Sequence, residues 1–554
     1  MKHPWTPKSV LLLKQYSRSW FIADLIAGVT VGLVALPLAM AFAISSGVAP
    51  QAGLYCAITA GFLISALGGS RFQIGGPTGA FVVVVAGIVG TYGLDGLFMC
   101  TMMAGVILIV FGATGMGSTI KYIPRPVVVG FTNGIAVLIA STQLKDFFGI
   151  PAAVPSEFWP RMVTLARNAS GVSPAATVLG ASTLVALLLM RRHVPRVPGY
   201  IVAMFVTTAL VALGAIHVET IGSRFGGIPG GWPALVIPKF RADLIPVLIR
   251  PALTVALLGA MESLMSAVVA DRMGGDQHNP NMELIAQGVA NVFSPLFGGL
   301  PATGAIARTA TNIRSGARTP VAGIVHAITL LVVLMVAAPL ARFIPLAALA
   351  AILLVVSYNM GDWGEVPELL KLTKTDISVW LVTFALTVFA DLTLAVEVGM
   401  VLAMFLFIRK IAVTTTVSLV TADYVEAGRV HSLQDKKIPG YVSVFRIHGP
   451  FLFGATDQIA RVLEHADALA PIVILRLRNM TAIDATGLRA FEDLADRLHK
   501  TGRELILCGA PRQPAALMHR SEFHEHVGTK NICPNIETAL ERAATVHLQM
   551  SIPA

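Results

Sequence analysis

Charged residues are scarce in this sequence. Asp, Glu, Lys and Arg make up 13% of the 554 residues, against roughly 25% in ordinary soluble domains. Hydrophobic residues make up 55%, and apolar runs near the ~20 residues needed to cross a bilayer recur between Leu25 and Phe407. This composition excludes a soluble globular protein and predicts a polytopic α-helical membrane protein embedded in the lipid bilayer.

Cysteine is also rare. Cys56, Cys100, Cys508 and Cys533 lie far apart and form no CxxC pair, which excludes a disulfide framework and argues against a cysteine-bound metal. The apolar segments hold no His/Asp/Glu cluster with metal-ligand spacing and no nucleophile next to a base. We therefore expect no enzyme activity, no catalytic residues, no metal and no cofactor.

The first apolar run is not followed by a signal-peptide cleavage site. We therefore interpret this run as a retained first span. The net charge of +10 does not indicate nucleic-acid binding, because many basic residues lie in short loops where they orient helices. An even number of spans and these basic loops place both termini in the cytoplasm. The expected location is the inner (plasma) membrane of a bacterial-type cell.

Hydropathy divides the chain into a membrane part and a tail. We expect a cytoplasmic N-terminus at 1–23, a transport domain at 24–410 with repeats at about 24–217 and 252–410, a linker at 411–438 and a tail domain at 439–547. The fourteen predicted membrane segments are 25–45, 50–69, a short one at 77–90, 95–115, 124–145, 172–190, 199–217, 252–270, 283–297, a short one at 302–315, 319–341, 344–360, 376–391 and 393–409.

Two short segments carry nearly the same interruption. "IGGPTGAF" occupies 74–81 and "GGLPATGAIAR" occupies 298–308. They precede or open the third and tenth segments, which is the same place in two sets of seven. Seven is odd, so a repeated set has the opposite orientation in the membrane, and such paired interruptions indicate a transporter's binding site near the midplane. Taken singly, each is better interpreted as an ordinary membrane kink, because Gly and Pro are common in such helices; the matched positions of the two favour the repeat.

The interruptions predict an anion site. A helix that starts at an unwound stretch has backbone N–H groups without helical acceptors and carries roughly half a positive charge. Glycine leaves these amides uncovered, and a threonine hydroxyl serves as a cap or as a ligand. An oxyanion is therefore the expected ligand. The predicted substrate-binding residues are Gly76, Thr78, Gly79, Ala302, Thr303, Gly304, Ala305 and Arg308.

Two ionisable residues lie inside predicted spans, where a charge costs at least ~2.5 kcal/mol. Arg308, about five residues into the tenth segment, either reaches the anion site or snorkels toward Arg314 and Arg318. Glu262 lies mid-span, so burial favours its protonated form and suits a proton carrier; a structural partner for Arg308 is the competing interpretation. His326, Asp391 and Glu397 are interpreted as packing or helix-end contacts.

The tail changes from helical to alternating periodicity. Strands are predicted at 442–447, 472–477 and 504–508, and helical patterns at 456–468, 486–499, 511–520 and 535–546. This alternation predicts a small cytoplasmic α/β domain. "NMTAIDATGLRAF" is a strand-to-helix turn, with Asp484 or Thr486 as a helix cap and Gly487 allowing close packing.

With these features, the chain resembles the sulfate permease family over nearly its whole length. "DLIAGVTVGLVALPLAMAFAISSGVAPQAGLY" at 24–55 is similar to the family's signature region, the two interrupted stretches resemble its half-helices, and the tail resembles a STAS domain. The sequence of the first span and the stretch "GGSRF" are similar to those of a dicarboxylate-transporting bacterial member. The resemblance implies fourteen spans in two inverted sevens, a core (spans one to four and eight to eleven) moving against a gate, and a homodimer.

The resemblance also implies roles for individual residues. Arg308 matches the family's arginine in span ten and Glu262 its acidic residue in span eight, where glutamate accompanies proton coupling and aspartate sodium coupling. Leu38 stands where many sulfate-transporting relatives have glutamine, which weakens the case for sulfate. Thr486, after Ala485, stands where STAS-like proteins carry a phosphorylated serine. The resemblance therefore implies a regulatory site at Thr486 and a cytoplasmic protein partner of this domain.

We therefore expect a secondary active anion transporter. The predicted reaction is proton-coupled symport, with sodium less favoured, of sulfate or of a four-carbon dicarboxylate such as succinate or fumarate by an elevator-like movement. The alternatives are a bicarbonate or chloride transporter or exchanger, and a channel-like anion-binding protein. Glu262 argues against the channel, because a passive pore needs no proton carrier.

Overall fold

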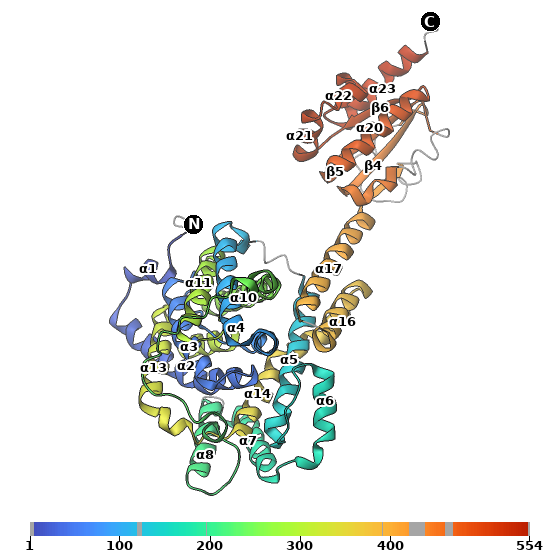
Figure 1. Cartoon of the computed structure of the whole chain (residues 1–554). Helices are drawn as coiled ribbons and strands as arrows, with labels where there is room; N and C mark the ends of the chain where they lie inside the picture. Colours follow the sequence, from blue (N-terminus) through green and yellow to red (C-terminus); the bar gives the residue numbers. More distant parts are fainter. Residues whose placement is uncertain are drawn as a thin grey trace. The chain divides into compact units, whose positions relative to one another are not determined.

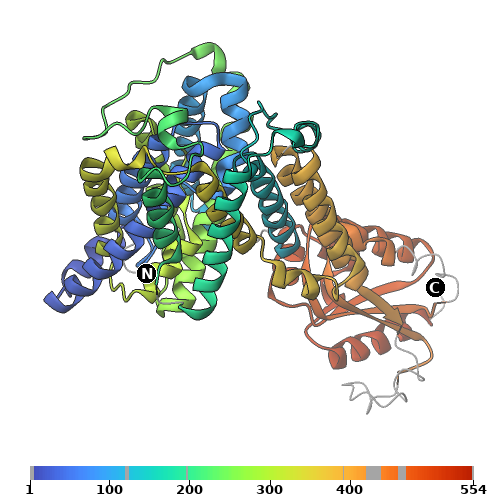
Figure 2. The same cartoon turned by 90° about the horizontal axis from the view of Figure 1, so that it is seen from below.

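The computed structural model describes residues 5–118, 124–194, 197–390, 392–419, 438–459 and 469–551. It divides into two units, Met1–Met400 and Val401–Ala554, and each is described by itself. The first is a bundle of packed helices (Figures 1 and 2). Its helices are α1 (Lys8–Leu13), α2 (Arg18–Ser45), α3 (Pro50–Leu67), α4 (Val82–Ala113), α5 (Arg125–Phe148), α6 (Phe158–Arg167), α7 (Pro174–His193), α8 (Gly199–Ala212), α9 (Ile221–Phe225), α10 (Ile245–Gly274), α11 (Pro280–Phe293), α12 (Ile306–Arg314), α13 (Val321–Ala341), α14 (Leu346–Met360), α15 (Val366–Leu369), α16 (Lys374–Phe389) and α17 (Leu392–Thr414), which extends into the second unit.

Each of the fourteen predicted segments falls on one of these helices. The third and fourth both fall on α4, which is interrupted at Gly93 (φ 71°, ψ −172°). Glycine adopts this backbone without the strain that a Cβ atom would add. Among the described residues, eight helices are long and apolar enough to cross a membrane. Asp391, near the end of the thirteenth predicted segment, lies outside the described residues.

Helix packing in the first bundle follows the predicted repeat. α2 packs on α13 as α10 packs on α4, and α3 packs on α13 as α11 packs on α4. In the predicted numbering, span 1 packs on span 11 as span 8 packs on span 4. Likewise, span 2 packs on span 11 as span 9 packs on span 4. The contacts are therefore exchanged between the two sets of seven, as an approximate twofold axis requires.

A second group of helices shows the same exchange of contacts between the two sets of seven. α5 packs on α14 and α16, and α14 packs on α7; α5 (teal) runs beside α16 (gold) in both views (Figures 1 and 2). The approach is close because glycines face the partner: a Cβ atom at Gly130 would lie 2.6 Å from the Trp380 carbonyl oxygen. This division matches the core and gate groups that the family resemblance implies.

The contact between α4 and α11 gives a stability test. A methyl group at Gly288 would lie 2.5 Å from the Gly105 carbonyl oxygen, and backbone cannot move aside as a side chain does. We expect Gly288→Ala to lower the free energy of unfolding by about 1–3 kcal/mol, measured by thermal unfolding of the protein in detergent. Gly87→Ala, also in α4 but with no atom within 4 Å, is the control and should unfold no earlier than the wild type. Equal unfolding temperatures for the two variants would contradict close helix contact here.

The second unit is built on a five-stranded sheet in the order β3-β4-β5-β6-β7. β3 is antiparallel to β4, and the other neighbours are parallel. The three predicted strands are present, and the short β3 and β7 were not predicted. The strands are β3 (Thr416–Leu419), β4 (Val442–Phe451), β5 (Ile472–Ile483), β6 (Glu504–Cys508) and β7 (Ile532–Cys533).

Helices cover both faces of this sheet. One apolar cluster joins the sheet to α20 (Ala485–Lys500), α21 (Arg512–Arg520) and α22 (His524–Val527), and a separate one joins it to α23 (Ile536–Met550). α20, α21 and α23 correspond to three of the predicted helical patterns, and the short α22 was not predicted. Of the fourth pattern, 456–468, residues 460–468 lie outside the described residues. Asp484 caps α20 by accepting from the Gly487 amide at 2.8 Å, as the turn sequence predicted.

Candidate functional site

The two interrupted stretches meet in the structure. β1 (Gly75–Gly76) pairs antiparallel with β2 (Thr303–Gly304), with Gly75 opposite Gly304 and Gly76 opposite Thr303. The Ala305 amide extends the pairing by donating to the Ile74 carbonyl at 2.9 Å. Two segments more than 220 residues apart thus satisfy each other's backbone in the middle of the bundle, where unpaired groups would cost several kcal/mol each.

Both helices start later than predicted. After β1, a short 3-10 turn at Gly79–Phe81 leads into α4, and after β2, α12 begins at Ile306. The stretch Pro301–Ala305 was predicted to open a helix, but it is extended because its backbone bonds to β1. Ala302 and Ala305 therefore lie before the helix rather than in it.

Neither threonine caps its helix. The Thr78 hydroxyl donates to Glu262 Oε2 at 3.0 Å, and the Thr303 hydroxyl donates to the Gly259 carbonyl at 3.0 Å. Thr303 also lies 2.7 Å from the Ser263 hydroxyl, which accepts from the Gly304 amide at 3.1 Å. One turn of α10 therefore contacts both interrupted segments.

Arg308 links the two repeats. It lies in the first turn of α12, is buried, and donates through Nη2 to the Pro77 carbonyl. A Cβ atom at Gly76 (φ 142°) would lie 2.7 Å from Arg308 Nη1, so both the backbone angle and the arginine require glycine there. The side chain therefore points toward the other repeat, not toward Arg314 and Arg318.

The position of Arg308 has an electrostatic consequence. A cation in the first turn of a helix lies at the positive end of the helix dipole, where an anion is favoured and a cation is not. Arg308 Nη1 also has no hydrogen-bond partner among the described residues, although a buried donor costs about 1–3 kcal/mol when unpaired. Positive charge and a free donor converge beside Gly76, an arrangement that an anion would stabilise.

Glu262 is half-buried in α10 and forms its side-chain hydrogen bond with Thr78. Within the described part of the chain it makes no ion pair with Arg308, whose Nη2 is bonded to Pro77. The interpretation of Glu262 as a structural partner of Arg308 stays a prediction, as does its interpretation as a proton carrier. At the crossing, the Glu262 carboxylate is held by the Thr78 hydroxyl, and the Arg308 guanidinium is held by the Pro77 carbonyl. Both holding groups belong to the first repeat, and neither contact pairs the carboxylate with the guanidinium.

Polar residues that the sequence analysis missed hold this crossing in place. The Asn291 amide in α11 brackets Ala302, donating to its carbonyl and accepting from its N–H, both at 2.8 Å. Thr309 in α12 accepts from the Ile74 amide at 3.0 Å. An asparagine inside an apolar helix was the available signal, because a buried amide needs partners for both its ends.

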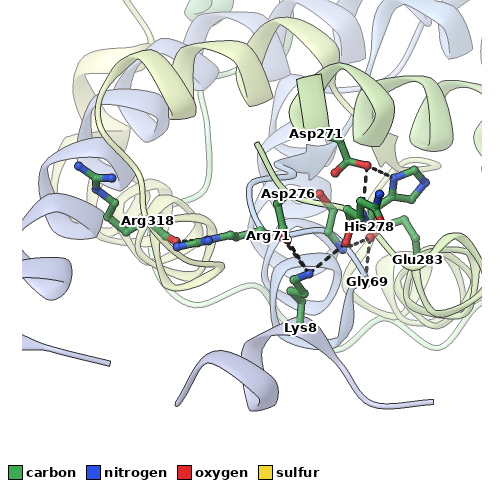
Figure 3. A network of polar contacts seen from close by, with 10 residues as sticks. Lys8, Gly69, Arg71, Asp271, Asp276, His278, Glu283 and Arg318 are labelled. Carbon is green, nitrogen blue, oxygen red and sulfur yellow. Dashed lines mark hydrogen bonds and ion pairs between the residues drawn. The ribbon is translucent and has the colours of Figure 1, made fainter. Parts of the chain in front are cut away.

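The loop before β1 is fixed by a buried carboxylate. Glu283, at the start of α11, accepts from the amides of Gly69 and Ser70 at 2.9 and 3.0 Å. Figure 3 shows this anchor beside the ion pair of Lys8 with Asp276 at 2.9 Å and the hydrogen bond between His278 Nδ1 and Asp271 Oδ2 at 2.6 Å. The network sets where the chain enters the crossing.

The site also touches the second helix group. A Cβ atom at Gly79 would lie 2.8 Å from Ile139 of α5 and 3.0 Å from the Met360 sulfur of α14. Glycine at this point therefore lets the start of α4 press against both helices.

His326 of α13 is buried and lies near the crossing, because a Cβ atom at Gly61 would be 3.2 Å from the Gly75 carbonyl oxygen and 3.5 Å from the His326 ring. Leu38 is buried in α2. Glu397 is exposed and lies 3.9 Å from Arg250, the kind of helix-end contact predicted for it. Thr486 is exposed in the first turn of α20.

The model of the sulfate permease family matches residues 21–383, and that of the STAS domain matches residues 433–539. The chain belongs to the sulfate permease family. This confirms the family resemblance, and with it the polytopic helical membrane fold carrying a C-terminal STAS domain. The family consists of transporters, so the protein is an anion transporter and not an enzyme.

Two related proteins match this chain over nearly its whole length. "Putative sulfate transporter YvdB" of Bacillus subtilis is 40% identical over 521 residues, covering 94% of this chain and 97% of that protein. The bicarbonate transporter BicA of Picosynechococcus is 30% identical over 537 residues, covering 94% of each.

Solved structures show the same fold. The transmembrane domain of a cyanobacterial bicarbonate transporter BicA is 34% identical with a TM-score of 0.61, covering 70% of this chain and 98% of that one. The murine solute carrier 26 family member A9 shares the fold at 18% identity, with a TM-score of 0.86 and coverage of 97% and 94%.

Proposed function

We propose that this sulfate permease relative is a proton-coupled symporter of a small oxyanion. The anion binds where β1 and β2 cross, contacting Arg308 and the uncovered backbone near Gly76, Gly79 and Gly304. The observation that carries the proposal is the hydrogen bond from Thr78 to Glu262. It places a titratable carboxylate at the same crossing point as the arginine, so that substrate and proton are bound by one set of residues.

Coupling follows from simple electrostatics. When Glu262 is ionised, its negative charge opposes a second anion at the crossing; when it is protonated, that repulsion disappears. Anion and proton therefore bind together more readily than either alone. Sodium is the less favoured coupling ion, because the one carboxylate at the crossing and the hydroxyls of Thr78 and Thr303 already have hydrogen-bond partners.

An elevator-like movement is proposed for the transport step. The helices that hold the crossing (α2, α3, α4 and α10 to α13) form one group, and α5, α7, α8, α14 and α16 form another. Gly79 lies where these two groups meet, so sliding one group past the other would carry the site across the membrane. A homodimer, in the inner membrane with both termini cytoplasmic, completes the proposal. Thr486 is proposed as a phosphorylation site, since its hydroxyl is exposed at a helix start.

The proposed substrate is sulfate or a four-carbon dicarboxylate, each a divalent oxyanion suited to the amides and guanidinium at the crossing. Bicarbonate is the second candidate, supported by the bicarbonate transporter among the relatives. Leu38, an apolar residue where many relatives carry glutamine, leaves the substrate contact to the crossing itself.

Uptake into liposomes tests the coupling and ranks the anions. Purified protein should accumulate labelled sulfate when the outside is acidified by one pH unit, and a protonophore should abolish the accumulation. Unlabelled succinate, fumarate, bicarbonate and chloride are then added in turn, and the strongest competitor identifies the substrate class. Uptake that ignores the pH gradient for every one of these anions would rule out proton symport.

A further inference from the structure

A second positively charged site lies in the STAS domain, outside the membrane unit. A cavity of about 340 Å³ is bounded by β5, the ends of β6 and β7, and the start of α23. This volume falls in the range of about 300–1,000 Å³ typical of small-molecule sites. The lining residues are Arg476, Arg478, Cys508, Gly509, Ala510, Pro534, Asn535, Ile536 and Glu537.

The cavity forms where an apolar row of the sheet ends. Side chains alternate between the two faces of a strand, so Ile472 and Ile474 pack under α23 while Arg476 and Arg478 continue the same row beyond it. Arg476 pairs in register with Cys508, the last residue of β6. The cavity therefore opens at the carboxyl ends of parallel strands, where α/β proteins bind their ligands.

Positive charge is concentrated there. Arg446 of β4 is the direct neighbour of Arg476 in the sheet, and like charges side by side are unfavourable. Arg476 is only 7% exposed. Burial is the main cause that holds the pKa of Arg476 below the usual range, and the charges of Arg478 and Arg446 act in the same direction.

The start of α23 adds to this field. The helix has 15 residues, and its cap Asn535 accepts from the Thr538 amide at 2.9 Å. The amides of Ile536 and Glu537 belong to the first turn, which has no helical acceptor. Burial raises the pKa of Cys508 to about 12, so its thiol is neutral, and Glu537 is the carboxylate among the lining residues.

We propose that this cavity binds an oxyanion, either a free ion such as phosphate or sulfate or the phosphate group of a small organic molecule. The guanidinium groups of Arg476 and Arg478 and the first-turn amides of α23 hold its oxygens. This proposal does not depend on proton symport or on the membrane site. It gives the STAS domain a ligand of its own, distinct from the exposed Thr486 on the other covered face.

Calorimetric titration of the purified full-length protein in detergent tests this. The titrations use an Arg308→Ala background, so that anions bound at the membrane crossing do not contribute. Inorganic phosphate, inorganic sulfate and ADP are the probes, and we expect saturable binding of at least one. Tighter binding of ADP than of either inorganic ion identifies an organic phosphate, and the reverse identifies a free oxyanion.

Variants of the cavity separate binding from folding. Arg476→Gln and the more exposed Arg478→Gln should each weaken binding at least about tenfold, as expected for a charge-assisted contact, whereas Glu537→Gln should strengthen it. Arg489→Gln, an exposed arginine on α20, removes the same charge from the opposite side of the sheet and should change nothing. No saturable binding of any probe, or an equal loss in Arg489→Gln, would overturn the proposal.

Discussion

Replacing Arg308 with alanine is expected to weaken substrate binding by about 30- to 1,000-fold. The guanidinium is buried at the crossing of β1 and β2, and removing one partner of a buried charged contact costs about 2–4 kcal/mol, where each 1.4 kcal/mol is a factor of ten. Binding is measured by calorimetric titration of the leading anion into purified protein, alongside uptake into liposomes. Arg308→Lys keeps the charge but loses the planar fork, and it should recover only part of the affinity.

Arg314→Ala is the matched control for this result. Arg314 lies on the same helix, but its side chain is exposed, so affinity and uptake should stay close to wild type. Thermal unfolding of all three variants shows whether the protein remains folded. If folded Arg308→Ala bound the anion as tightly as the wild type, Arg308 would serve only to tie α12 to Pro77, and the anion site would have to lie elsewhere.

Replacing Glu262 with glutamine is expected to abolish pH-driven accumulation while preserving anion binding. Glutamine has nearly the same shape and still accepts from Thr78, but it neither gains nor loses a proton. In the wild type, one pH unit supplies about 1.4 kcal/mol per coupled proton, enough for about tenfold accumulation. Labelled anion inside liposomes should therefore rise about tenfold above equilibrium for the wild type and not at all for Glu262→Gln.

Exchange of labelled for unlabelled anion provides the companion measurement. It requires movement of the loaded site but no net proton transfer, so Glu262→Gln should still catalyse it. Glu397→Gln, which removes an exposed carboxyl near a helix end, should behave as wild type in both assays. Glu262→Gln that still accumulates anion under an acid-outside gradient would exclude Glu262 as the proton carrier.

The local features of this protein were readable from its sequence. Long apolar runs indicate membrane spans, because a helix satisfies its own backbone groups where no water is present. Fourteen segments could be placed in this way, with the two short ones placed by their repeated motif. The glycines and prolines at 74–81 and 298–308 forced breaks in two spans. Arg308 and Glu262 stood out because charge inside an apolar segment is costly. Each of these signals lies within a few consecutive residues.

Helix starts and hydrogen-bond partners were less readable. The stretch Pro301–Ala305 has residues suited to a helix start, yet it is extended because it pairs with a strand more than 220 residues away. Thr78 and Thr303 are good caps by type, but α10 offers them nearer partners in Glu262 and Ser263. Tertiary contacts overrode local preference at each of these positions.

The sequence by itself determined that this protein crosses the membrane repeatedly, breaks two matching helices and carries an α/β tail, because hydropathy, periodicity and backbone freedom are properties of neighbouring residues. Only the tertiary structure decided that the two breaks pair as β1 and β2, that Glu262 bonds Thr78 across 184 residues, and that Arg446 lies beside Arg476 in the tail. These contacts join segments distant in the chain, and they are fixed by helix packing and strand register, which no short stretch of sequence encodes.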